Sequence, residues 1–127
     1  MSVMAERMLA CIREGGAASC VELVRAAGQE ATGDCCLSLP GHPNTLLWVN
    51  VSERFLEAFN EIKDEVEPYP ASVLVYAWDG EVLNLPQVRR LGKQDFKTPH
   101  WLPVTFGLRE QHISSLARKE KSEKRSN

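Results

Sequence analysis

Four cysteines and three histidines are the side chains of this sequence best suited to metal binding or redox chemistry. Their closest grouping is Cys35, Cys36 and His42. A structural zinc site needs four converging donors, and the chain has neither a C-x-x-C pair nor two histidines four residues apart. Asp34 also disfavours a reactive thiolate at Cys35, because thiolates are activated by nearby positive charge. We therefore expect no metal, no cofactor and mostly buried, reduced thiols.

Catalytic motifs are the next feature to consider. The sequence contains no Gly-rich phosphate loop and no dinucleotide-binding fingerprint. His100 precedes Trp101 and lies between two prolines, a setting that can line a cleft, although a histidine fixed by one backbone hydrogen bond accounts for the same residue. The sequence therefore predicts a protein that is not an enzyme. A small-molecule pocket or active site around His100 and Trp101 is an alternative.

Charge is divided unevenly along the chain. Residues 1–81 carry 13 acidic and 5 basic side chains, whereas residues 82–127 carry 4 acidic and 10 basic side chains. Such asymmetry indicates a charged partner, a self-complementary oligomer or a basic arm on an acidic body.

The basic late segment supports a second hypothesis, which is nucleic-acid binding. Lys and Arg neutralise phosphates, and Phe96 or Trp101 is available to stack on a base. A solvated loop and tail account for the same charges, since Glu120 and Glu123 interrupt the basic tail. The candidate nucleic-acid contacts are Arg89, Arg90, Lys93, Lys97, Arg118 and Lys119.

Three helices must position these groups. Apolar residues at helical spacing predict a first helix over residues 4–14. Ser19 and Glu22 form a capping-box pattern that begins a second helix over residues 20–27. The third and longest helix covers residues 52–65.

This longest helix has an acidic outer face. Ser52 is well placed to cap it, and its apolar residues recur every three or four positions, as they do in a helix that packs on a core. The opposite face carries mostly carboxylates and is a candidate partner interface. Its members are Glu53, Glu57 and Glu61.

Strands are predicted where β-branched and aromatic residues cluster. Between the second and third helices, residues 30–39 are rich in turn formers and allow only a short helix. Asp79 and Gly80 separate two β-rich runs and predict a type I′ hairpin, because both residues tolerate positive φ. The predicted strands are 45–51, 72–78, 81–85 and 101–106.

Three tryptophans fall within or at the ends of these strands. With the other aromatic residues they exceed what one face of a small sheet needs. Partly exposed aromatic side chains mark a ligand pocket or a partner surface, whereas helices that cover both faces of the sheet bury them. The candidate partner interface therefore also includes Trp48, Trp78 and Trp101.

The N-terminal pattern is that of a helix ending in Gly15-Gly16, then a Ser-capped helix with the stretch Val-Glu-Leu-Val-Arg-Ala-Ala-Gly. Residues 5–28 thus resemble the start of a winged helix-turn-helix domain, and the hairpin over 72–86 corresponds to its wing. The resemblance implies that residues 29–39 supply the helix that enters the DNA major groove. That segment carries carboxylates and no Lys or Arg, and phosphates repel carboxylates. We therefore expect protein contacts rather than duplex reading.

The sequence predicts one α+β domain over residues 1–108, in which an N-terminal helix pair and one longer helix pack on a small, mainly antiparallel sheet of three or four strands. Residues 109–127 are expected to form a charged, flexible tail. No apolar run reaches the ~20 residues that cross a bilayer, and no signal-peptide pattern is present, so we expect a cytoplasmic protein without membrane contact. The predicted function is a non-enzymatic accessory or regulatory module that acts through a protein partner or a homo-oligomer.

Overall fold

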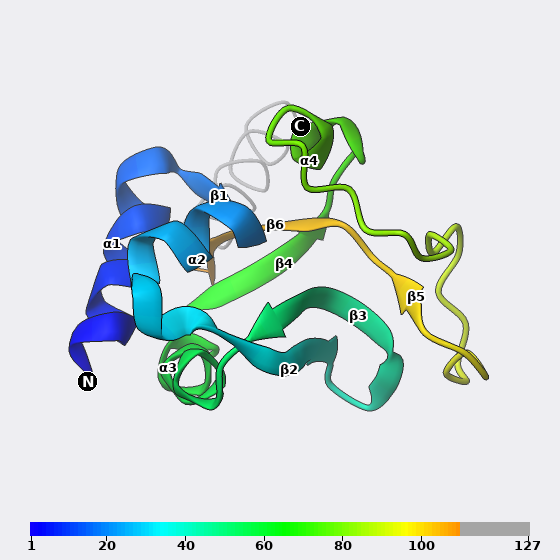
Figure 1. Ribbon diagram of the computed structural model, residues 1–127, viewed down its shortest axis with the longest axis horizontal. Helices are drawn as coiled ribbons and strands as arrows, with labels where there is room; N and C mark the ends of the chain where they lie inside the picture. Colours follow the sequence, from blue (N-terminus) through cyan, green and yellow to red (C-terminus); the bar gives the residue numbers. More distant parts are fainter. Residues whose placement is uncertain (110–127) are drawn as a thin grey trace, which may run out of the picture.

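The computed structural model describes residues 1–109, and these residues form an α+β fold, as predicted (Figure 1). The elements are, in chain order, α1 (Val3–Gly15), β1 (Ala17–Ser19), α2 (Cys20–Ala27), the 3-10 helix η1 (Gln29–Ala31), β2 (Thr32–Leu39), β3 (His42–Val51), α3 (Glu53–Ile62), β4 (Val66–Pro70), α4 (Leu74–Ala77), β5 (His100–Trp101) and β6 (Val104–Leu108). None of the helices in this part of the chain is both long and apolar enough to cross a membrane.

The strands lie in two sheets of three strands each. In the first sheet, β6 lies between β1 and β4, and all neighbours are antiparallel. In the second, β3 pairs with β2 in an antiparallel hairpin and with β5 in parallel. Figure 1 shows α1 and α2 on one side of the molecule, with β5 at the opposite side. Only Leu102 and Pro103 separate β5 from β6, so the chain passes directly from one sheet into the other.

α2 begins at the predicted residue, α1 and α3 begin within one residue of the predicted start, and each of the three helices has a serine at its N-cap. Ser2 accepts a hydrogen bond from Ala5, and Ser52 accepts one from Phe55. Ser19 and Glu22 form the complete capping box at the start of α2. These bonds satisfy backbone N–H groups that have no partner within the helix.

Residues 30–39 do not form the short helix that the sequence allowed. They contain the end of η1 and the strand β2, which pairs with β3 across a turn at Pro40 and Gly41. Gly41 has a φ of 80°, which favours glycine. Gly33 is required for another reason, since a Cβ there would lie 2.7 Å from the Cα of Ser52. Tertiary pairing with β3 thus overrides the turn-forming composition of this segment.

The prediction of a hairpin over residues 72–86 is wrong. Residues 74–77 form one turn of helix, α4, and residues 81–85 form no strand. Gly80 does adopt a positive φ of 69°, but it does so in the turn that ends α4, where the amide of Glu81 bonds to the carbonyl of Tyr76 at 3.1 Å. Positive φ at glycine serves a helix C-terminus as well as a hairpin, so the Asp-Gly pair did not distinguish them.

An aromatic cluster fills the core between α4, β3 and β5. Tyr76 stacks on Trp48 with ring centroids 5.0 Å apart and meets the edge of Trp101 at 5.1 Å. The Tyr76 hydroxyl donates a hydrogen bond to the carbonyl of Val104 at 2.6 Å and accepts one from the amide of Cys20 at 3.0 Å. One side chain therefore joins α4 to the start of α2 and to β6.

Replacing Tyr76 with phenylalanine is expected to lower the free energy of unfolding by about 2 kcal/mol, because the substitution leaves a buried carbonyl and a buried amide without their partner. Chemical denaturation of the variant measures this loss. Tyr69→Phe is the matched control, since its hydroxyl bonds to Glu67 near the surface and its loss should cost less. Equal destabilisation by the two variants would contradict the role given to Tyr76.

Candidate functional site

The three tryptophans of the predicted interface have different environments. Trp48 and Trp101 are buried in the core, so neither is available to a partner. The Nε1 of Trp101 is buried and has no hydrogen-bond partner among residues 1–109. Trp78 is instead 90% exposed, the highest exposure among the large apolar side chains of residues 1–109. The expectation of exposed tryptophans was therefore wrong for two of the three.

Trp78 belongs to an apolar surface that α4 creates. Leu74 is four residues earlier, so the two side chains lie on one helical face, and Leu74 is 64% exposed. Val82, in the turn that follows, is 49% exposed. We call Leu74, Trp78 and Val82 the α4 surface. Tyr76 is the buried residue of the same turn, and it holds this surface against the core.

Charged groups of both signs border the α4 surface. The guanidinium of Arg25, on α2, lies 3.5 Å from the carboxylate of Asp79. Glu81 is exposed and, with Arg25, helps to line a small cavity of about 170 Å³. Trp48 and two valines of α2 complete the lining of this cavity, which therefore has both charged and apolar walls.

The acidic face of α3 lies elsewhere. Glu53, Glu57 and Glu61 are all exposed, as predicted. Figure 1 shows α3 near the bottom of the view and α4 near the top, with the sheets between them, so the helices that carry these carboxylates and Trp78 are separate. The interface predicted from the sequence is therefore two separate surfaces.

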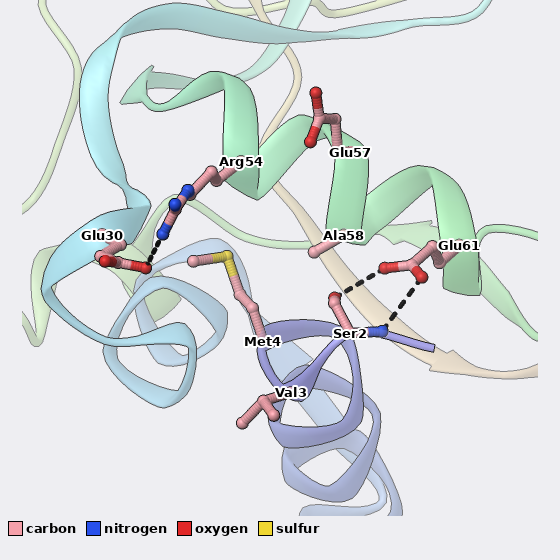
Figure 2. A pocket seen from close by; sticks show the side chains of 8 residues that line it. All are labelled: Ser2, Val3, Met4, Glu30, Arg54, Glu57, Ala58 and Glu61. Carbon is pink, nitrogen blue, oxygen red and sulfur yellow. Dashed lines mark hydrogen bonds and ion pairs between the residues drawn. The ribbon is translucent and has the colours of Figure 1, made fainter.

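A pocket of about 450 Å³ lies between the start of α1 and α3 (Figure 2). Glu61 accepts hydrogen bonds from the Ser2 amide at 3.0 Å and from the Ser2 hydroxyl at 2.6 Å, and these bonds lower its pKa. Arg54 pairs with Glu30 across the pocket. Figure 2 shows Glu57 pointing away from Ser2 and Met4. Because Arg54 pairs with Glu30 and Glu61 is hydrogen-bonded to Ser2, three of the four charged side chains that line this pocket are already engaged, which leaves little free charge for a ligand.

An apolar groove of about 500 Å³ is a feature that the sequence did not reveal. It lies between α3, the hairpin of β2 and β3, and the ends of β4 and β6. Leu39, Leu56 and Phe59 contribute to its lining, and Arg109 lies at its edge. Phe59 belongs to the apolar stripe predicted to face the core, and periodicity alone does not show that this residue stays half-buried.

Four of the six predicted nucleic-acid contacts lie within the described residues. Arg89, Arg90, Lys93 and Lys97 are exposed on the connection between α4 and β5. Arg118 and Lys119 lie outside the described residues, as does the rest of the predicted tail from residue 110.

His100 and Trp101 point into different surroundings. The His100 ring stacks on Phe96 with ring centroids 4.0 Å apart, and its Nδ1 lies 2.8 Å from the carbonyl of Thr98. Trp101 faces the buried aromatic cluster. The Trp101 side chain is fully buried, whereas His100 is half-buried, so the two side chains face different surroundings and a pocket around them stays a prediction.

The cysteines are unpaired, and their burial is uneven. Cys20 is buried, Cys11 and Cys35 are half-buried and Cys36 is exposed, so the expectation of mostly buried thiols was wrong. Within residues 1–109, no three His, Cys, Asp or Glu side chains converge as metal ligands. Burial raises the pKa of Cys20 to about 12.

Comparisons with protein-family models, curated proteins and solved structures gave no match to this chain. The likeness of residues 5–28 to winged helix-turn-helix domains therefore rests on the sequence pattern alone. After α2, where that likeness implies a recognition helix, the chain forms η1 and β2. The segment expected to be the wing contains α4 instead.

We expect Cys36 to react with a thiol reagent in the native protein and Cys20 to resist it. With a pKa of about 12, Cys20 has a thiolate fraction of about one in ten thousand at pH 8, and its sulfur is also shielded. Mass spectrometry after timed alkylation identifies the labelled residue. Denatured protein is the control, in which both thiols should react. Native labelling of Cys20 as fast as Cys36 would contradict the burial of this thiol.

Proposed function

We propose that this chain is a non-enzymatic interaction module that self-associates through the α4 surface. The observation that carries the proposal is the 90% exposure of Trp78 on a turn whose other side is fixed in the core. Tryptophan is among the residues that contribute most to binding at protein interfaces, because it buries a large apolar area with few rotatable bonds.

The rigidity of the α4 surface supports this proposal. Two hydrogen bonds and two ring contacts hold Tyr76, and Tyr76 lies between Leu74 and Trp78 in the same turn. A surface that is already ordered loses less conformational entropy on binding than a flexible one. The exposed pair is therefore presented in a geometry ready for association.

The charges around the α4 surface favour a second copy as the partner. A two-fold interface brings the same patch of both subunits together, so the patch must be complementary to itself. Arg25 is a cation that pairs with Asp79, the residue after Trp78, and Glu81 is an anion that lines the same cavity as Arg25. In a two-fold dimer, Arg25 of one subunit can meet Glu81 of the other while the apolar side chains pack at the centre.

This arrangement is consistent with an accessory or regulatory protein that acts as a dimer. We place it in the cytoplasm, because the free cysteines of residues 1–109 suit a reducing compartment.

Sedimentation velocity over a dilution series tests the proposal. We expect a concentration-dependent dimer in the unaltered protein, and we expect Trp78→Ala to weaken it by roughly tenfold or more, since the substitution removes the central apolar contact. Arg25→Glu should weaken the dimer as well, because it places like charges opposite each other.

Leu91→Ala is the matched control, because Leu91 is an exposed apolar residue, at 46%, on a different segment. It should leave the dimer unchanged. A mass of one chain at every concentration, or equal dimerisation of the Trp78→Ala variant, would overturn the proposal.

A further inference from the structure

We propose that residues 87–100, here called the basic loop, bind single-stranded nucleic acid. The basic loop combines four cations that form no ion pair within residues 1–109 with a stacked aromatic pair, and this combination suits a chain of phosphates and bases. The site is separate from the α4 surface and does not depend on self-association.

The basic loop is held at both ends and near its middle. Gln87 forms a β-bridge with Trp101, and the Val88 amide bonds to the Trp101 carbonyl at 2.8 Å. Near the middle, the Asp95 carboxylate accepts hydrogen bonds from the Asn44 amide at 2.7 Å and the Thr45 hydroxyl at 3.1 Å. The two ends of the loop therefore lie together at the Gln87–Trp101 bridge, and hydrogen bonds join the middle of the loop to the start of β3. The backbone that carries the four cations is therefore held in place at three points.

Within residues 1–109, the cations of this loop have no acidic partner. None of the ion pairs among residues 1–109 involves Arg89, Arg90, Lys93 or Lys97. Asp95 is the one carboxylate within the loop. Burial opposes the ionisation of Asp95, but hydrogen bonds from backbone and hydroxyl groups and the nearby His42 lower its pKa. This carboxylate contacts Asn44, Thr45 and His42, which all belong to β3. Four positive charges are therefore free to neutralise phosphates.

An aromatic platform lies beside these charges. Phe96 and His100 stack with an interplanar angle of 14° and a centroid separation of 4.0 Å. Both residues are half-buried, so neither is enclosed in the core. A nucleobase that joins this stack brings its own phosphates toward Lys97, which follows Phe96 in the chain. Stacking on aromatic side chains is how many proteins bind unpaired bases without reading their sequence.

The structure favours a single strand over a duplex. Reading a duplex requires a helix or a two-stranded ribbon that fits the major groove. The basic loop contains no helix and no two-stranded ribbon, so it is neither. Unpaired bases, in contrast, are free to reach a half-exposed ring.

Fluorescence anisotropy with a labelled oligothymidine of about a dozen nucleotides tests the charge contribution. We expect the double substitution Arg90→Glu and Lys93→Glu to reduce affinity at least tenfold and to flatten the salt dependence, because fewer counterions are released. Lys63→Glu is the matched control, since Lys63 is an exposed cation at the end of α3, and it should retain most of the affinity.

The stacking contribution is tested with Phe96→Leu, which keeps an apolar side chain but removes the ring. We expect roughly a 5- to 150-fold loss for oligothymidine and little change for an abasic strand of the same length, which has phosphates without bases. Circular dichroism and thermal unfolding confirm that each variant is folded. A folded variant that loses affinity for both probes equally would overturn the stacking role of Phe96.

Further probes separate this site from other polyanion sites. Binding of polyglutamate or polyphosphate as tight as that of oligothymidine would overturn the proposal and indicate a general anion site. Absence of binding at low salt would overturn it as well. Trp78→Ala should leave oligothymidine binding unchanged, so a failure of self-association and a failure of nucleic-acid binding are distinguishable.

Discussion

The hydroxyl of Tyr76 makes the interaction on which the arrangement of this molecule depends. A helix of a single turn is not stable alone, because nucleation fixes several residues for each hydrogen bond gained. α4 has only one turn, and Tyr76 stabilises it by bonding to the start of α2 and to β6 while its ring packs between Trp48 and Trp101. The same interaction determines which side chains of α4 face outward.

The sequence predicted the features that depend on local chemistry. The caps at Ser19 and Ser52 and the periodicity of the three long helices were confirmed, because capping and periodicity act within a few residues. The α+β class followed from the same elements. The prediction for the segment around Tyr76 failed because it used only the local β-rich composition. The conformation of this segment depends on hydrogen-bond partners 28 and 56 residues away. Pairing of β2 with β3 was missed for a different reason, because turn-forming residues lie within the strand β2 itself.

The candidate surfaces were predictable only in part. The basic residues of the loop and the acidic residues of α3 are exposed, as their polarity implied. The tryptophans could not be sorted in this way, because Trp48, Trp78 and Trp101 have the same chemistry and differ only in where the fold puts them. The uneven division of charge was visible in the sequence, but its meaning depended on Asp95, whose engagement with Asn44 and Thr45 leaves the neighbouring cations free.

The passage of the chain from β5 into β6 has a consequence for cooperativity. Leu102 bonds to the carbonyl of Leu46 in the second sheet, and the carbonyl of Pro103 accepts a bond from Ala71, which follows the first sheet's β4. Because this connection is only two residues long and is hydrogen-bonded to both sheets, opening one sheet strains the other. Amides of both sheets should exchange with solvent through one global opening event, and the protein should lose its two halves together.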